Sequence, residues 1–271
     1  MPQSKLLVHP DHAADGVGGH RITPQNAGWR YVGFETRTLK RGATSELDTG
    51  DRELCIVVLS GKARVVAGSF NSGTIGERAS VFDGLPWSVY LPPRSAGMFE
   101  AETDCELALC SAPAEGRLGA RVVPPNEVGT LTRGSGANAR HIRNVLPEDA
   151  EAESLLVVEV ITPGGNWSSY PPHKHDRDAL PDESYLEETY YHRLKPPQGF
   201  AFQRVYTDDR SLDETLTVKD GDVVLVPKGY HPVGAPYGYD LYYLNVMAGP
   251  KRVWRFHNDP AHAWLIRADP E

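Results

Sequence analysis

The stretch "YLEETYYHRLKPPQGFAFQRVY", which runs from Tyr185 to Tyr206, holds two strand-length runs with a turn between them. The runs Thr189–Arg193 and Ala201–Tyr206 are rich in Tyr, Phe and Val, which favour strands, whereas Pro and Gly break the chain between them. A second stretch, "DRELCIVVLSGKARV" from Asp51 to Val65, has the same order of acidic residue, strand, glycine turn and strand. The sequence therefore predicts two similar β-units.

Each unit continues with a turn, a strand and a proline. The two continuations are "DGLPWSVYLPPRS" (Asp83–Ser95) and "KDGDVVLVPKGYHP" (Lys219–Pro232). Other short apolar runs are also bounded by turn residues: Leu54–Leu59, Lys62–Ala67, Leu107–Cys110, Leu155–Ile161 and Tyr239–Met247. Short helices are expected only near Pro147–Glu153 and Ser211–Glu214, because no long segment keeps a 3.6-residue apolar period. The predicted class is mainly β, a barrel or a sandwich.

The chain length of 271 residues suits one large domain or two of ordinary size. The segment "LTRGSGANARHIRN" (Leu131–Asn144) is rich in Gly, Asn and Arg and lies between the two β-units. We therefore expect one domain over residues 1–135 and a second over residues 136–271.

Composition narrows the function classes. A formal net charge of -8 argues against a nucleic-acid or anionic-membrane partner, although local arginines could still hold an acidic substrate. No apolar stretch approaches the roughly 20 residues of a membrane span, and the N-terminus lacks the pattern of a secretory signal, so we expect a cytoplasmic protein. Cys55, Cys105 and Cys110 lie in apolar runs without a CxxC pair, and they are predicted to be core residues.

Two histidines follow a proline pair in "NWSSYPPHKHD" (Asn166–Asp176). In a strand, side chains at i and i+2 point to the same face. His173 and His175 should therefore converge, while Lys174 between them points away. The HxH spacing is a weak signal by itself, because it also occurs by chance on surface strands.

Further ligands for a metal are available downstream. Glu187 and Glu188 open the following strand, and His231 lies in Lys219–Pro232, after Pro227 and Gly229. Three imidazoles and one carboxylate suit Zn, Mn, Fe(II), Ni or Co, with coordination positions left for substrate or water.

Here the sequence resembles the cupin superfamily. The usual first cupin motif, a glycine, HxH and then Glu, is matched by Gly165, His173, His175 and Glu188, with a longer gap before the Glu. The second is matched by Gly221, Pro227, Gly229 and His231, with one residue fewer before the histidine. Glu188 is preferred over Glu187, because cupins commonly show Glu-x-Tyr-Tyr at the ligand strand. The resemblance implies a bicupin, two tandem cupin-type β-barrels or jelly rolls.

The first half lacks an HxH and any histidine after Pro92, and Glu53 stands alone where a ligand Glu might lie. It resembles a degenerate cupin without a metal site, with roles in packing and assembly. One divalent metal per chain is therefore expected, held by His173, His175, Glu188 and His231, with Zn the first choice.

Longer motifs resemble the 5-deoxy-glucuronate isomerase family, bicupin sugar-acid isomerases of myo-inositol breakdown. They are "GNWSSYPPHKHD", "LEETYYHR", "PPQGFAFQRVYTDDRSLDE", "VLVPKGYHPVGAPYGYDLYYLNVMAG" and the aromatic segment Trp254–Trp264. The resemblance implies conversion of 5-deoxy-D-glucuronate to 5-dehydro-2-deoxy-D-gluconate through an enediolate. A small sugar acid is then the substrate, and a homo-oligomer is expected because bicupins often pair through their strands.

This chemistry needs a polarised carbonyl, a base that moves a proton and a cation that holds the uronate carboxylate. Strand parity places Tyr190 and His192 on the face of Glu188, His192 as a candidate proton shuttle. Tyr243, on the strand after His231, is a candidate acid or hydroxyl donor.

Arg204 is the candidate carboxylate clamp, because it is in phase with Phe200 and Phe202, which could line the barrel. The alternative reading is an ion pair at the barrel rim. Two other functions stay open at this stage, an Fe(II)-dependent cupin dioxygenase with the same ligand set and a non-catalytic sugar-binding cupin. The longer motifs favour the isomerase.

Overall fold

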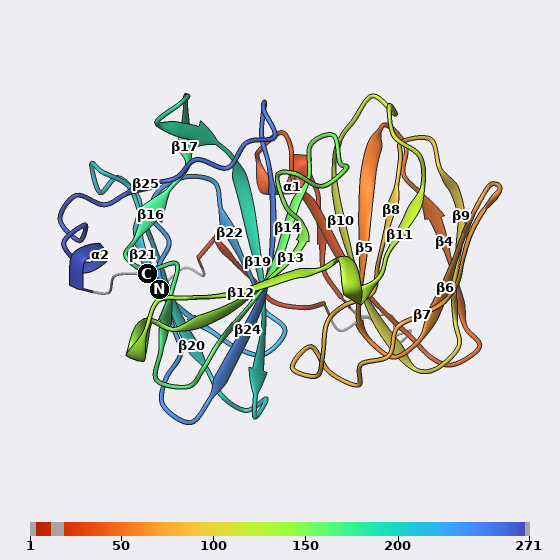
Figure 1. Cartoon of the computed structure of the whole chain (residues 1–271), viewed down its shortest axis with the longest axis horizontal. Helices are drawn as coiled ribbons and strands as arrows, with labels where there is room; N and C mark the ends of the chain where they lie inside the picture. Colours follow the sequence, from red (N-terminus) through yellow and green to blue (C-terminus); the bar gives the residue numbers. More distant parts are fainter. Residues whose placement is uncertain (1–3, 12–18, 269–271) are drawn as a thin grey trace. The chain divides into compact units, whose positions relative to one another are not determined.

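Strands dominate the computed structural model, which describes residues 4–11 and 19–268 of the chain (Figure 1). The described α-helices are two single turns, α1 (Pro24–Ala27) and α2 (Leu265–Ala268), and the described 3₁₀ turns are Pro125–Glu127 and Gly136–Asn138. None of these described helices is long and apolar enough to cross a membrane. The predicted mainly β class is confirmed, whereas the helices expected near residues 147–153 and 211–214 are wrong, because those segments form turns, bends and the start of a strand.

The chain divides into two compact units. Unit 1 contains Met1–His9, Thr130–Arg143 and Val158–Glu271, and unit 2 contains Pro10–Gly129 and Asn144–Val157. The boundary predicted after residue 135 falls inside a unit 1 segment, and the chain then returns to unit 2 before its last crossing. The units are therefore not consecutive halves of the sequence.

Unit 2 is built from two antiparallel sheets. One has the order β11 (Arg121–Val123), β8 (Ser88–Leu91), β5 (Arg52–Ser60), β10 (Cys105–Pro113), β3 (Gly33–Leu39) and β2 (Arg21–Ile22). The other has the order β4 (Thr44–Asp48), β9 (Ala96–Ala101), β6 (Ala63–Ala67) and β7 (Phe70–Ile75).

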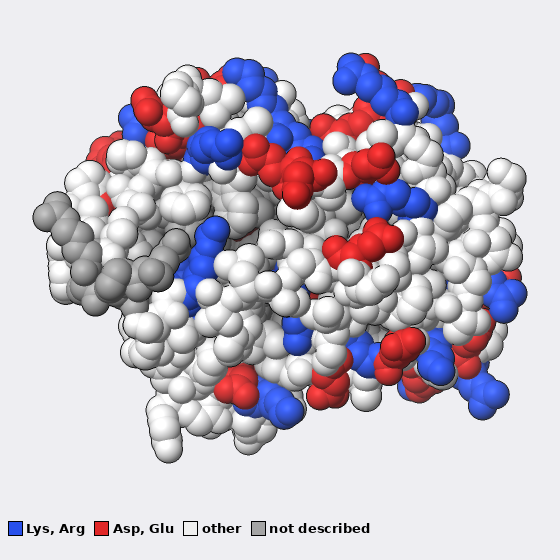
Figure 2. All heavy atoms as spheres, viewed as in Figure 1, with Lys and Arg blue, Asp and Glu red and all other residues white. Residues whose placement is uncertain are grey.

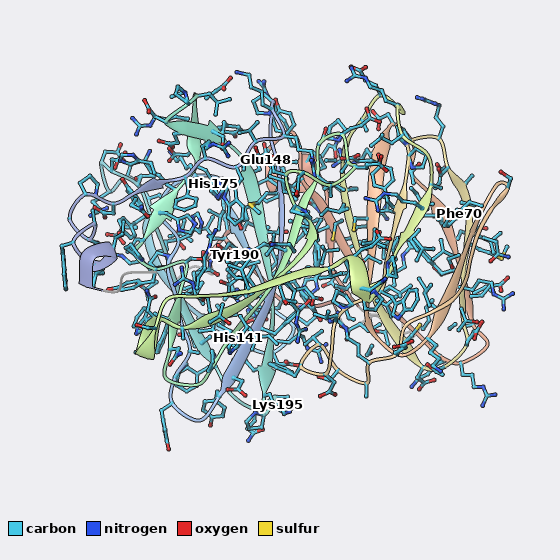
Figure 3. All side chains as sticks on the ribbon, viewed as in Figure 1. Phe70, His141, Glu148, His175, Tyr190 and Lys195 are labelled. Carbon is cyan, nitrogen blue, oxygen red and sulfur yellow. The ribbon has the colours of Figure 1, made fainter. Side chains whose placement is uncertain are left out.

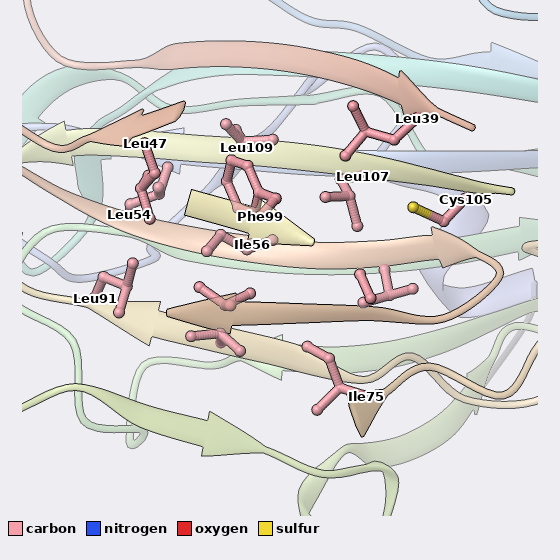
Figure 4. Close-up of a cluster of buried hydrophobic side chains, with 14 of the residues drawn as sticks. Leu39, Leu47, Leu54, Ile56, Ile75, Leu91, Phe99, Cys105, Leu107 and Leu109 are labelled. Carbon is pink, nitrogen blue, oxygen red and sulfur yellow. The ribbon is translucent and has the colours of Figure 1, made fainter. Parts of the chain in front are cut away.

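An apolar cluster fills the space between these sheets (Figure 4). Alternate residues of β5, Leu54, Ile56 and Val58, pack with Phe99 and other buried side chains of both sheets. Cys105 belongs to this cluster, and burial raises the pKa of its thiol to about 11, so the sulfur stays protonated at neutral pH. The three cysteines are buried and free, as predicted.

Glu53 ties the returning segment Asn144–Val157 to unit 2. The buried Glu53 carboxylate accepts hydrogen bonds from the backbone N–H groups of Glu153 (2.8 Å), Ser154 (2.6 Å) and Leu155 (2.6 Å). The Tyr90 hydroxyl donates a fourth bond, 2.7 Å long. Glu53, which stands where a ligand Glu might lie in the first half, therefore uses its carboxylate in structural hydrogen bonds.

Most of the strands of unit 1 belong to a seven-stranded sheet and a four-stranded sheet. The larger has the order β1 (Leu7–Val8), β22 (Val223–Val226), β19 (Glu187–Lys195), β24 (Asp240–Ala248), β14 (Leu156–Thr162), β13 (Arg140–Leu146) and β12 (Gly129–Arg133). The smaller has the order β15 (Trp167–Ser168), β23 (Val233–Gly234), β20 (Ala201–Tyr206) and β21 (Asp213–Val218). Two short pairs, β16 (His173–Lys174) with β25 (His257–Asn258) and β17 (Asp176–Ala179) with β18 (Glu183–Tyr185), complete the unit.

The central strand β19 lies between β22 and β24, and this register positions the site. Glu188 is opposite Val226 on one side and Met247 on the other, both buried. The carboxylate is therefore flanked by apolar neighbours and shielded from water.

On the face drawn in Figure 2, acidic and basic side chains are interspersed rather than separated into regions of one sign.

Candidate metal centre

The four predicted ligands meet in unit 1. The ligand atoms of His173, His175 and His231 all lie within 4.8 Å of one another. Glu188 Oε2 is 3.1 Å from His175 Nε2 and 3.3 Å from His231 Nε2. His175, Glu188 and His231 are buried and His173 is partly buried; His175 is labelled in Figure 3, as is Tyr190.

Backbone carbonyls orient two of the imidazoles. His175 Nδ1 lies 3.0 Å from the carbonyl oxygen of Leu186, and His231 Nδ1 lies 2.9 Å from that of Gly229. A carbonyl can only accept, so each Nδ1 carries a hydrogen, and in the neutral ring each Nε2 keeps the lone pair that a metal needs. With both rings neutral, two lone pairs and a carboxylate oxygen face one another in a buried space.

This arrangement fits a cation. The buried His231 Nε2 has no hydrogen-bond partner. Buried acceptors that face one another are costly unless a proton or a metal ion lies between them. Three imidazole nitrogens and one carboxylate oxygen are ordinary ligands of divalent transition metals, so these residues could hold one.

The electrostatics favour neutral imidazoles at two of the ligands. Burial lowers the pKa of His231 to about 4. Burial, together with the nearby His231 and His175, lowers the pKa of His173 well below its ordinary value. Burial also opposes the charged form of His175, but the hydrogen bond and the charge of Glu188 outweigh it and raise the pKa of this imidazole. Neutral imidazole is the form that binds metal.

A polar face continues from the ligands along β19 and β24. Tyr190 is opposite Asn245 and His192 is opposite Tyr243 in the strand register. The Tyr190 ring lies 5.7 Å from the His231 ring and 4.9 Å from the Tyr243 ring, between centroids. Cross-strand pairs on one face of a sheet are neighbours, so the structure brings together the three predicted site residues Tyr190, His192 and Tyr243.

Burial sets the protonation states of the tyrosine and histidine side chains on this face. Burial raises the pKa of both Tyr190 and Tyr243, so both keep their hydroxyl hydrogen at neutral pH. Burial also lowers the pKa of His192 to about 4, which keeps this imidazole neutral. His192 Nε2 lies 2.9 Å from Gln203 Oε1, whereas His192 Nδ1 has no hydrogen-bond partner among the described residues.

Arg204 does not belong to this face, and its contacts fit the alternative reading of an ion pair better than the predicted role of carboxylate clamp. In β20 the alternate residues Ala201, Gln203 and Val205 are buried, whereas Phe202 is 42% exposed on the outer face that Arg204 shares; Tyr206, at the end of the strand, is buried again. The Arg204 guanidinium forms a bidentate pair with Asp213, with bonds of 2.8 and 2.7 Å. Phe202 and Arg204 do share one face of β20, as strand parity predicts, but this face points away from the site.

Two further details differ from or refine the prediction. Lys174 points away from the ligands but not to solvent; it is 1% exposed and its ammonium lies 2.6 Å from an Asp176 oxygen. Of the two candidate glutamates, Glu188 contacts the imidazoles, and strand parity turns Glu187 to the other face.

Some residues at the site carry no sequence signal. Ser169 has a left-handed backbone, with a φ of 50°, and its hydroxyl lies 3.0 Å from that of Tyr190. Arg133 ends β12 and Arg140 begins β13, in the Gly-rich segment that the sequence marks only as a domain boundary. The charges of both arginines contribute, after burial and the neighbouring imidazoles, to the lowered pKa of His173.

The chain is similar to known proteins over most of its length. The KduI/IolB family matches residues 6–265. A protein of Geobacillus kaustophilus named 5-deoxy-glucuronate isomerase is 56% identical over 98% of this chain and 96% of its own. One of the same name from Bacillus subtilis strain 168 is 51% identical, over 91% and 92% of the two chains.

Solved structures agree with this likeness. The crystal structure of an IolB-like protein from Salmonella typhimurium has a TM-score of 0.93 and 52% identity, covering 96% of this chain and 98% of that one. A Bacillus subtilis oxalate decarboxylase is similar in fold alone, with a TM-score of 0.66 at 15% identity over 95% and 80% of the two chains. The predicted bicupin fold is confirmed. The extent of the family match and the identity to its named relatives show that this chain belongs to the KduI/IolB family.

Proposed function

We propose that this protein is an aldose–ketose isomerase that converts 5-deoxy-D-glucuronate to 5-dehydro-2-deoxy-D-gluconate in myo-inositol catabolism. The observation that carries the proposal is the cluster of three histidines and Glu188 beside two protonated tyrosines, in a chain 56% identical to a named 5-deoxy-glucuronate isomerase. A cytoplasmic location and a homo-oligomeric state belong to the same proposal.

The metal would be held by His173, His175, Glu188 and His231, one ion per chain. Zn is the first choice for this ligand set, with Mn, Fe, Ni or Co as alternatives. When bound, such an ion supplies a Lewis acid that polarises a carbonyl oxygen of the substrate.

The protein's own groups would move the protons. The reaction takes a proton from C2, returns one to C1 and shifts a hydroxyl proton from O2 to O1, so it needs no external oxidant. With Gln203 Oε1 accepting from Nε2–H, His192 keeps a lone pair on Nδ1, and burial keeps the ring neutral and able to accept the carbon-bound proton. Tyr190 and Tyr243 would donate hydrogen bonds to the sugar oxygens on which negative charge develops.

Arg140, with Arg133, takes the place of Arg204 as the proposed partner of the substrate carboxylate. The positive charge of Arg140 contributes to the pKa of both His173 and Tyr243, which supports a role beside the ligands and the proposed hydroxyl donor. Its guanidinium also donates to the carbonyl oxygen of Asn138 (3.0 Å), a bond that steadies the side chain at the start of β13. Arginine is the side chain best suited to a carboxylate, because its planar fork makes two parallel bonds.

The test is NMR of the purified protein with 5-deoxy-D-glucuronate in D₂O. The expected result is the ketose product with deuterium from solvent at C1, formed without oxygen. Turnover that requires and consumes O₂ would instead support a dioxygenase. Binding without turnover would support a sugar-binding cupin.

A further inference from the structure

A cluster of charged side chains, with the buried Lys174 at its centre and the exposed Asp208 and Arg177 at its edge, lies beside the ligand segment. Lys174, between the two histidines of the HxH, is 1% exposed. Its Nζ lies 2.6 Å from Asp176 Oδ1, 3.3 Å from Asp208 Oδ2 and 3.4 Å from Glu183 Oε1. Lysine is rarely buried unless it is paired, and here one ammonium gathers carboxylates from three different segments. Arg177 pairs with the other oxygen of Glu183 at 3.0 Å and offsets part of the excess negative charge.

The cluster is bonded to both ligand-bearing segments. Asp176, the residue after His175, accepts the backbone N–H of Gly229 at its Oδ2, 2.9 Å away. The Gly229 carbonyl in turn accepts from His231 Nδ1, also at 2.9 Å. A short path of hydrogen bonds therefore runs from the HxH segment to the ring of the third histidine.

The turn before His231 depends on this path. Gly229 has a φ of +91°, and a Cβ at this position would lie 2.5 Å from the carbonyl oxygen of Tyr206. Only glycine fits there, so no side chain of residue 229 can fix the turn, and its backbone bonds must do so. A second link reinforces the first, because the Tyr230 hydroxyl donates to Asp208 Oδ1 at 2.8 Å, and Asp208 also contacts Lys174.

We propose that Lys174 and Asp176 are positioning residues, which hold the His173–His175 segment and the His231 turn at the separation that a metal needs. They touch neither metal nor substrate. The inference rests on the proposed metal site and adds the device that sets its geometry. Residues that orient metal ligands in this way change metal affinity about 10- to 100-fold when they are replaced.

The test is a Zn²⁺ competition titration with a chromophoric chelator on the wild type and on Asp176→Asn. Asparagine has the size of aspartate, but it must turn its NH₂ group toward either Lys174 or the Gly229 N–H, so one of the two bonds is lost. The expected result is a Zn²⁺ affinity lower by about 10- to 100-fold, with an unchanged circular dichroism spectrum. Faster hydrogen exchange of the Gly229 amide should accompany the loss.

The matched control is Lys251→Met. Lys251 forms an exposed pair with Asp178, 3.3 Å long, in the same unit, and its removal should leave Zn²⁺ affinity within about twofold of wild type. Because Lys174→Met alone leaves buried carboxylates without their cation, the double variant Lys174→Met/Asp176→Asn is the second arm, and it should also bind Zn²⁺ weakly.

Two outcomes separate this inference from the proposed function. If the wild type binds Zn²⁺ tightly and Asp176→Asn binds it equally well, the positioning role is overturned while the metal site stands. If the wild type itself binds no divalent metal, both are overturned.

Discussion

At the scale of single residues, the positions of the hydrogen atoms on the imidazole rings decide which nitrogens can bind a metal. Carbonyl oxygens opposite Nδ1 of His175 and His231 commit both neutral rings to the same tautomer, and the two Nε2 atoms then face Glu188. Neither the HxH spacing nor strand parity predicts a tautomer. It follows only from the backbone of Leu186 and Gly229, which comes close to the rings in the folded chain.

His175→Ala should lose most of its bound metal and lower isomerase activity by several orders of magnitude, while its circular dichroism spectrum stays that of the wild type. The unit should survive because buried apolar strands, rather than the metal, form its core. His141→Ala is the control, an exposed imidazole on β13 whose Nδ1 contacts the Thr132 hydroxyl. Lys174→Ala would be a poor control, since that side chain is buried among carboxylates.

His192 predicts a pH dependence of the metal-free protein. Its pKa is lowered to about 4 in the folded state, so below its ordinary value of about 6.5 the unfolded chain binds the extra proton first. This group therefore lowers the free energy of unfolding as the pH falls from about 6.5 to about 4, by roughly 3 kcal/mol in all. Urea unfolding of His192→Gln across this range should show a weaker pH dependence than the wild type; an identical dependence would contradict the assignment.

At the scale of elements, strand parity tells which side chains share a face but not which face is inside. In β19 the metal-ligand pattern identifies the inner face, and Tyr190 and His192 lie where parity places them. In β20 no ligand marks a face, and two aromatic residues suggest an interior that the fold places outside. The polar strand β21 overlaps the helix predicted near residues 211–214, because its sequence "DETLTV" is half exposed and has few apolar residues to show a two-residue period.

A prediction for substrate binding concerns Arg140, at the start of β13. Arg140→Lys keeps the positive charge but loses the planar fork, so it should raise KM about tenfold or more with a smaller effect on kcat. Arg204→Ala, which removes an outer-face pair with Asp213, should leave both constants near those of the wild type. A raised KM for Arg204→Ala and unchanged kinetics for Arg140→Lys would reverse the assignment.

The hydrogen bonds of the Glu53 carboxylate should contribute to the stability of unit 2. Glu53→Gln replaces one carboxylate oxygen by an NH₂ group that faces backbone donors, and it should lower the free energy of unfolding by at least about 2 kcal/mol. Tyr90→Phe removes one bond to the same carboxylate and should cost about 1 kcal/mol. Chemical denaturation measures both, and an equal or larger loss for Tyr90→Phe would place the main support elsewhere.

At the scale of the whole molecule, the two β-units have similar strands but different side chains in their interiors. In unit 1 the inner face of β19 carries Glu188, Tyr190 and His192, whereas in unit 2 the corresponding strand β5 turns Leu54, Ile56 and Val58 into an apolar cluster. The sequence repeat predicted similar architecture for both. It could not predict that the chain crosses between the units more than once, because those crossings depend on contacts such as that of Glu53 with residues 153–155.

This difference predicts one tight metal ion per chain. Among the described residues, His173, His175 and His231 form the one group of three or more potential ligands within mutual reach, and the interior of unit 2 is closed by hydrocarbon side chains around a protonated Cys105. Elemental analysis of the purified protein after dialysis should therefore give one equivalent of divalent metal. His175→Ala should reduce it to well below one, because the part of unit 2 that the structure describes offers no second cluster to retain the ion. Two tightly held equivalents in the wild type, or one that persists in His175→Ala, would show that the first β-unit kept a metal site despite its apolar core.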